Sequence, residues 1–134
     1  MNSDSSAKSL TGVWQGTYTY SSGLKPEPFI ATLIEAGHSL SGSTHEPGAH
    51  RDGRPGTLYA LISGARAGSH ASFTKTYDGT GGWDHSIEYS GTVNGEATEI
   101  VGEWTFPGQW AGRFLMVRQG NAKQEVKQRA VEKV

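Results

Sequence analysis

Short runs of alternating apolar and polar residues recur along the chain, and Gly, Pro, Asn or Asp bounds each run. The runs follow one another at intervals of about ten residues, as in small all-β domains. Alternation with a period of two residues is typical of a strand that buries one face. The pattern predicts about eight strands, over residues 12–20, 29–35, 39–46, 58–66, 71–77, 85–93, 98–106 and 110–118.

The connections between these runs are mostly short, which favours antiparallel neighbours joined in sequence order. Residues 47–56 and 78–84 are the exceptions, and we interpret them as loops long enough to carry function or to cover an opening. Eight consecutive antiparallel strands suit either a sandwich or an up-and-down barrel. Because sandwiches usually need longer crossovers between sheets, the prediction is an all-β, antiparallel up-and-down β-barrel of about eight strands.

The two ends of the chain lack this alternation. Residues 1–9 are small and polar, which predicts a disordered N-terminal tail. After the barrel domain (10–118), residues 119–134 are rich in charge, and Val126 and Ala130 lie one helical turn apart. We expect this C-terminal tail to form a short, largely solvated helix.

Asn94-Gly95 is the strongest hairpin signal in the sequence, because a type I′ turn needs positive φ at both central residues. A two-residue loop would set Tyr89 opposite Ile100 and His85 opposite Trp104, with all four side chains on one face.

The next turn, at residues 107–109, is best read with three loop residues. That register sets Glu103 opposite Arg113 as a cross-strand charge pair, and it sets Trp104 opposite Gly112, which leaves room for the indole. The inner face of the last strand would then carry Phe114, Met116 and Arg118. Its outer face belongs to an exposed apolar strip, which makes a homo-oligomer plausible, through Val101, Leu115 and Val117.

Composition and charge narrow the classes of function. The chain has 134 residues, 12 basic and 13 acidic side chains, and a net charge of −1, so it has no long-range field to attract nucleic acid or an anionic membrane. It has no cysteine, which excludes disulfides and thiol nucleophiles. Neither a secretory signal nor a membrane-spanning run is evident, so a soluble, cytoplasmic protein is expected.

Three stretches resemble the avidin and streptavidin family of eight-stranded barrels, within the calycin group that includes lipocalins. "LTGVWQG" (10–16) has the Gly-x-Trp opening, and "FIATLIEAGHSLSG" (29–42) is similar to the second hairpin of streptavidin. "HSIEYSGTVNGEATEIVGEW" (85–104) is similar to the segment with an aromatic-Ser-Gly, a turn and a Trp. The resemblance implies a barrel with a ligand pocket at its open end.

The same resemblance implies aromatic pocket walls without the family's polar contacts. Tyr77, Tyr89 and Trp104 fall where avidins place pocket tryptophans, and Trp110 falls where a neighbouring subunit lends one. The hydrogen-bonding Asn, Thr and Asp of the family fall on Gly16, Ile87 and Arg118. A buried urea would lose several hydrogen bonds of about 1–3 kcal/mol each, so tight biotin binding is not expected.

The candidate ligand contacts lie on the inner face of the predicted barrel. The aromatic enclosure would come from Tyr18, Tyr77, Tyr89 and Trp104, with Tyr18 beside room left by Gly16. His85, Lys75 or Arg118 would orient the ligand. Buried cations need partners, so these three make an anionic organic ligand a candidate. The alternative is that His85 and Lys75 lie hydrated at the barrel mouth. We expect Trp14 to pack in the core.

The sequence offers little for chemistry or for metals. His85 and Glu88 have opposite strand parity, and there is no Gly-x-Ser-x-Gly elbow. His38, His45, His50 and Asp52 match no compact ligand motif, so neither a metal nor a cofactor is expected. The leading hypothesis is therefore a barrel that binds a small molecule without transforming it. The alternatives are an oligomeric structural or interaction module with a filled barrel, and a barrel isomerase or cyclase.

Overall fold

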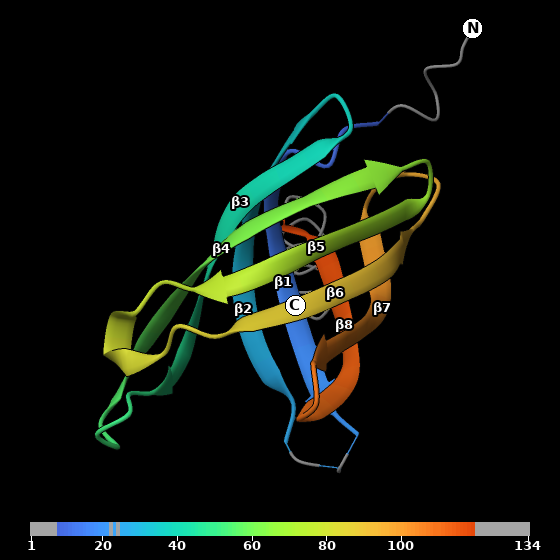
Figure 1. The fold of residues 1–134 in the computed structure, drawn as a ribbon. Helices are drawn as coiled ribbons and strands as arrows, with labels where there is room; N and C mark the ends of the chain where they lie inside the picture. Colours follow the sequence, from blue (N-terminus) through green and yellow to red (C-terminus); the bar gives the residue numbers. More distant parts are fainter. Residues whose placement is uncertain (1–7, 22, 24, 120–134) are drawn as a thin grey trace, which may run out of the picture.

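The chain forms a closed barrel of eight antiparallel strands in a computed structural model that describes residues 8–21, 23 and 25–119 (Figure 1). Each strand pairs with its neighbours in sequence, and the last strand closes the barrel on the first. This confirms the predicted all-β antiparallel barrel. The strands are β1 (Gly12–Tyr20), β2 (Glu27–Ala36), β3 (Ser39–Ala49), β4 (Pro55–Ala67), β5 (His70–Tyr77), β6 (Ser86–Val93), β7 (Glu99–Phe106) and β8 (Trp110–Arg118).

The strand bounds agree with the predicted ranges to within two residues except at one loop. Residues 47–56 were expected to be a loop, but β3 runs to Ala49 and β4 begins at Pro55, so the connection is only residues 50–54. The loop 78–84 contains a short 3-10 turn, η2 (Thr80–Gly82). Nearly all of the expected N-terminal tail and C-terminal helix lies outside the described residues.

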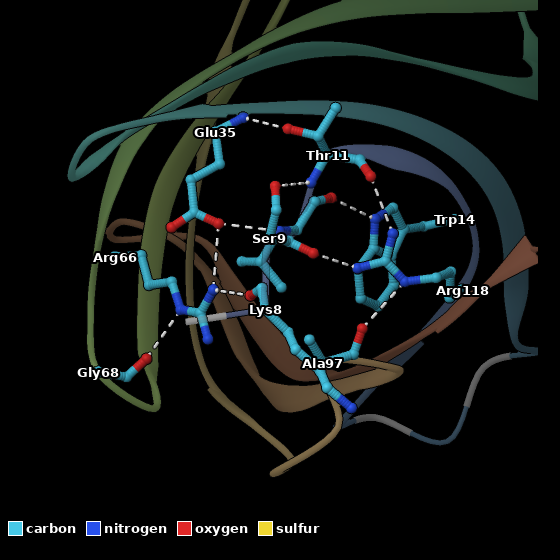
Figure 2. Close-up of polar contacts among 10 residues, drawn as sticks. Lys8, Ser9, Thr11, Trp14, Glu35, Arg66, Gly68, Ala97 and Arg118 are labelled. Atoms are coloured by element: carbon cyan, nitrogen blue, oxygen red, sulfur yellow. Dashed lines mark hydrogen bonds and ion pairs between the residues drawn. The ribbon is translucent and has the colours of Figure 1, made fainter. Parts of the chain in front are cut away.

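The barrel has two different ends. The β3–β4 and β5–β6 connections lie side by side at one end, together with the β1–β2 and β7–β8 turns (Figure 1). The first described residues lie at the opposite end, beside the hairpin turns β2–β3, β4–β5 and β6–β7 (Figures 1 and 2). We call the first of these the open end and the second the closed end.

The predicted register between β7 and β8 is confirmed. Glu103 pairs with Arg113, and Trp104 pairs with Gly112. A Cβ at Gly112 would lie 2.7 Å from the Trp104 Nε1 and 1.8 Å from the Thr19 carbonyl oxygen. Only glycine therefore allows both the indole and β1 to approach this point of β8.

The predicted two-residue turn between β6 and β7 is wrong. Val93 pairs with Ile100 and Tyr89 with Trp104, and the loop between the end of β6 and the start of β7 contains five residues, 94–98. The Asn94 Oδ1 accepts hydrogen bonds from the backbone N–H groups of Thr98 (2.8 Å) and Glu99 (2.9 Å). An Asn side chain that caps a wider loop replaces the tight turn. Because the register moves by four residues, an even number, every side chain keeps its predicted face.

The closed half of the barrel is filled by apolar side chains. Its largest members are less than 2% exposed, namely Leu10, Trp14, Leu33, Leu40, Ile100 and Met116. The expected packing role of Trp14 fits this position, since its Nε1 donates to the Leu10 carbonyl at 2.9 Å.

Two arginines bind the backbone of residues 8–11, which we call the N-terminal segment, across the closed end (Figure 2). Arg118 donates to the carbonyl oxygens of Ser9 (2.5 Å), Thr11 (2.9 Å) and Ala97 (3.0 Å). Its guanidinium carbon lies 4.7 Å from the centre of the Trp14 ring.

Arg66 is the second arginine that binds the N-terminal segment. It donates to the carbonyls of Lys8 and Gly68 and pairs with Glu35 at 3.1 Å. The same Glu35 oxygen accepts from the Leu10 N–H at 2.8 Å. These contacts join the N-terminal segment to β2 and β4 and close this end of the barrel.

Candidate functional site

A cavity of about 540 Å³ occupies the open half of the barrel. Aromatic rings form a large part of its wall, because the inward positions of β1, β5, β6 and β7 carry them at this level. The main rings are Tyr18, Tyr20, Tyr77, Tyr89, Trp104 and Phe106. A volume of this size is within the range of small-molecule sites in proteins.

The floor of the cavity is a buried ion pair. Glu46, at the open-end half of β3, is 2% exposed, and Lys75 of β5 is 1% exposed. The Lys75 Nζ lies 2.5 Å from the Glu46 Oε1. Burial lowers the pKa of Lys75, and the neighbouring Glu46 carboxylate opposes that shift. The pair leaves the floor with no net charge.

Two phenols complete the floor. The hydroxyls of Tyr18 and Tyr77 donate to the Glu46 Oε2 at 2.8 and 3.0 Å. Burial, and then the Glu46 charge, raises the pKa of both tyrosines. Both phenols therefore stay protonated and hold the carboxylate in place.

Aromatic faces surround the Lys75 ammonium. Its Nζ lies 4.8 Å from the centre of the Phe29 ring, 5.1 Å from Tyr18 and 5.2 Å from Tyr77. Cation–π attraction offsets part of the cost of burying the charge.

The wall above the floor is a set of rings in edge contact. Tyr20 meets Trp104 at 5.2 Å between ring centres and Trp110 at 5.5 Å, both nearly perpendicular. The Trp104 Nε1 donates to the Thr19 carbonyl at 2.9 Å, which fixes the indole. Trp110 is 57% exposed and stands at the rim.

His85 joins the wall on the other side. Its ring stacks on Phe106 at 4.8 Å and lies 4.8 Å from Tyr77. Burial lowers the pKa of His85, and Asp84 opposes the shift. The imidazole is therefore neutral at pH 7, because the ordinary value of about 6.5 is already below that pH.

The rim is held together by contacts between two loops. The backbone N–H of Arg51 donates to the Gly81 carbonyl at 2.7 Å, and the Trp83 Nε1 donates to the Ala49 carbonyl at 2.8 Å. The Arg51 guanidinium also lies over the Trp83 ring at 5.0 Å. These contacts join the β3–β4 and β5–β6 loops into one continuous side of the opening.

The structure gathers most of the predicted contact residues in this cavity. Tyr18, Tyr77, His85, Tyr89 and Trp104 line it. Lys75 lies directly beneath the wall, in the ion pair of the floor.

Two expectations about position differ from the structure. Arg118 lies at the closed end, where its guanidinium is engaged by backbone carbonyls, so it is not brought together with the others. The room expected at Gly16 is filled by Phe29, whose Cζ would lie 2.2 Å from an added Cβ.

Sequence reasoning missed Glu46, which accepts three hydrogen bonds at the centre of the site. The sequence did indicate it. Glu46 and Leu40 are an even number of residues apart on one strand, so both side chains point to the inner face. An inward Lys75 on the next strand but one required an anion of this kind. Trp83 and Phe106 were also missed.

Within residues 8–21, 23 and 25–119, no group of three or more His, Asp or Glu side chains is placed to hold a metal ion. The same residues contain no helix long and apolar enough to cross a membrane. Comparison of the sequence with protein-family models and with curated proteins gives no significant match. Fold and site together define the chain as an eight-stranded antiparallel barrel with an aromatic cavity at one end.

Proposed function

We propose that the protein binds a small organic molecule in the aromatic cavity at the open end of the barrel. The observation that carries the proposal is the cavity of about 540 Å³, whose walls are rings and whose floor has a few converging polar groups. Concave apolar space with a small number of placed polar groups is characteristic of ligand sites.

The distribution of packing favours binding over a structural module with a filled interior. The closed half is packed with fully buried apolar side chains, whereas the open half leaves a cavity of about 540 Å³ between its rings. A barrel used only as a structural unit would gain stability by filling that space.

The charges in the site bear on the expectation of an anionic ligand. That expectation depended on Lys75, His85 and Arg118 as unpaired cations. Lys75 is paired with Glu46, Arg118 is engaged at the closed end, and the pKa of His85 is lowered. The arrangement therefore favours a neutral ligand, and an anionic ligand remains the competing proposal.

The test compares ligand binding by the intact protein and a cavity variant. Native mass spectrometry of protein purified from its source, followed by a thermal-shift screen of small aromatic compounds, supplies ligands to measure. Tyr20→Ala removes the ring between Trp104 and Trp110, and we expect it to weaken binding by at least about tenfold. Tyr59→Ala, on the outer face and 48% exposed, is the matched control and should bind normally.

Two outcomes would contradict the proposal. One is a screen in which no compound stabilises the protein, and the other is equal loss of binding in Tyr20→Ala and Tyr59→Ala. Turnover of a bound compound would instead favour the isomerase or cyclase alternative.

We also propose kinship with the avidin family without tight biotin binding. A closed eight-stranded antiparallel barrel is common to that family and to other barrels, so the fold supports the kinship without identifying it. The floor offers Glu46 and two phenols that already donate to it, rather than free donors for a ureido oxygen. A calorimetric titration with biotin that gave tight binding would refute this part of the proposal.

A second copy of the chain is the proposed partner of the outer strip Val101, Leu115 and Val117. Val101 and Leu115 pair across β7 and β8 and are 42% and 40% exposed. Sedimentation analysis of Leu115→Glu would show a smaller assembly than the parent protein if this strip is an interface.

A further inference from the structure

We propose that the inner end of the ligand is a neutral hydrogen-bond donor, an N–H or O–H group on a planar ring. This inference deepens the proposed function and depends on it. It follows from the direction in which the hydroxyl protons of Tyr18 and Tyr77 are donated at the cavity floor.

The carboxylate of Glu46 can only accept hydrogen bonds, and its oxygens have about four lone-pair sites. Two are taken at Oε2 by the phenols of Tyr18 and Tyr77, and one is taken at Oε1 by Lys75. One site at Oε1 is left over. Glu46 lines the cavity, so this remaining site accepts and never donates.

The phenols of Tyr18 and Tyr77 are turned into acceptors by the same carboxylate. Each hydroxyl has one proton, and that proton is donated to the Glu46 Oε2. What each phenol oxygen has left for a ligand is its lone pairs. A ligand carbonyl directed at this floor would meet oxygen lone pairs, whereas a ligand N–H or O–H would find an acceptor.

Lys75 sets the charge of the ligand group that fits here. Its ammonium neutralises Glu46 and is 1% exposed, beneath the wall rather than on it. An anion at the floor would face carboxylate and phenol oxygens, because the Lys75 ammonium beside them is only 1% exposed and Arg51 lies at the rim. A cation would lose its hydration at a floor that has no net charge to compensate it. A neutral donor avoids both penalties.

The neighbouring indole N–H groups are not free to donate to a ligand, so the floor still offers mainly hydrogen-bond acceptors. The Nε1 groups of Trp104 and Trp83 donate to the carbonyls of Thr19 and Ala49. Tyr89 also lines the cavity, and its hydroxyl rotor can accept or donate, so it is compatible with a donor ligand.

The walls specify a planar ring above that donor. Trp104 is fixed by its backbone hydrogen bond, and Tyr18 and Tyr20 meet it edge to face at 6.0 and 5.2 Å. Rings held in this way present flat and edge surfaces that suit an aromatic ligand.

The experiment uses four bicyclic probes of similar shape, titrated into the full-length protein at pH 7 and followed by protein-observed NMR. Indole supplies a neutral N–H, and benzofuran replaces that N–H with an oxygen that only accepts. Indole-3-carboxylate adds an anion, and tryptamine adds a cation. We expect indole to bind about tenfold more tightly than benzofuran, since one net hydrogen bond is worth about that factor. The charged probes should bind no better than benzofuran.

Variants at the floor test whether these residues cause the preference for indole over benzofuran. Glu46→Gln combined with Lys75→Met keeps the site neutral but gives it an amide that can donate, and Tyr18→Phe removes one phenol oxygen while keeping the ring. Each should reduce the preference for indole to about threefold or less. The matched control combines Glu103→Gln with Arg113→Met at the outer pair, which is 74% and 73% exposed, and it should keep the full preference.

The outcomes separate the inference from the proposed function. Equal binding of indole and benzofuran, or tighter binding of a charged probe, overturns the inference while leaving a ligand-binding cavity in place. Failure of every probe at millimolar concentration overturns both. If the double variant at the floor unfolds, Tyr18→Phe decides the result alone, and an unchanged preference in it overturns the inference.

Discussion

At the scale of single residues, one carboxylate organises the interior. Glu46 accepts from an ammonium and two phenols that come from two other strands, β1 and β5. Lys75 and Tyr77 are buried and Tyr18 is half-buried, so each relies on Glu46 as its hydrogen-bond partner. Burying an ion pair adds little net stability, but breaking one leaves an uncompensated charge in an apolar interior. Glu46 therefore acts as the common partner on which three other side chains rely.

Removing Glu46 should be among the most damaging substitutions in the chain. Glu46→Ala leaves the Lys75 ammonium unpaired, and we expect it to lower the free energy of unfolding by about 3–5 kcal/mol. The combination of Glu46→Gln with Lys75→Met should cost less, because no buried charge is left. Urea unfolding measures both. Glu103→Ala at the exposed pair should change stability by no more than about 1 kcal/mol, and an equal loss there would contradict the explanation.

The buried phenols predict a loss of stability in alkali. The pKa values of Tyr18, Tyr77 and Tyr89 are raised in the folded protein, chiefly by burial. Above pH of about 10 the phenols of the unfolded chain ionise while the folded ones do not, so folding binds protons and stability falls as pH rises. Each such phenol contributes a slope of about 1.4 kcal/mol per pH unit.

Lys75 acts in the opposite direction but at lower pH. Its folded pKa is lowered, so its contribution rises with pH and is complete near its ordinary value of about 10.4. Urea unfolding at several values above pH 10.5 isolates the phenols. Tyr77→Phe should make the decline shallower by one phenol's share, and an unchanged slope would show that Tyr77 does not carry it.

At the scale of strands and loops, period-two alternation predicts which face a side chain takes but not its height along the barrel. Arg118 and Tyr18 both point inward, yet one lies at the closed end and the other at the cavity floor. The height depends on where the barrel closes and on the stagger of its strands, which are long-range properties. Glu46 was predictable by parity from Leu40, whereas the position of Arg118 was not.

Turn chemistry is the other limit of what the sequence predicts. Asn94-Gly95 indicates a two-residue turn, but the loop is wider because the Asn94 side chain accepts two backbone N–H groups. Ala97 adopts a positive φ of 56° there, and its carbonyl oxygen accepts a hydrogen bond from the Arg118 Nε. That tertiary contact favours the wider loop and has no local signature in the sequence.

The Asn94 side chain should therefore stabilise this loop measurably. Asn94→Ala removes both accepted hydrogen bonds and the donated one to the Thr98 hydroxyl, and we expect a loss of about 1–2 kcal/mol in unfolding free energy. Asn94→Asp keeps both acceptors and should lose less. Thermal unfolding of the two variants provides the comparison, and equal losses would show that the acceptors are not the cause.

At the scale of the whole molecule, the two ends of the barrel are built differently. The closed end holds an N-terminal segment through Arg66 and Arg118, and it contains the fully buried apolar core. The open end holds the cavity and the exposed Trp110. The fully buried apolar core and the cavity thus lie in different halves of one sheet.

This separation predicts that stability and binding respond independently. Arg118→Ala removes three hydrogen bonds to carbonyls and the contact with Trp14, and it should lower the unfolding free energy by about 2–4 kcal/mol. The affinity for indole should stay within about twofold of the parent, because no cavity residue changes. Arg113→Ala on the outer face is the control for loss of a guanidinium. A large loss of affinity in Arg118→Ala would contradict the separation.

The contacts that close one end of the barrel also limit the route by which a ligand could reach the cavity. Within the described residues, Leu10 and Trp14 are fully buried at the closed end, so we expect a ligand to enter through the open end. The loops joined by Arg51 and Trp83 form one side of the opening at that end. Because Arg51 and Trp83 also line the cavity, we expect substitutions at this rim to change the rates of ligand entry and exit and the affinity as well.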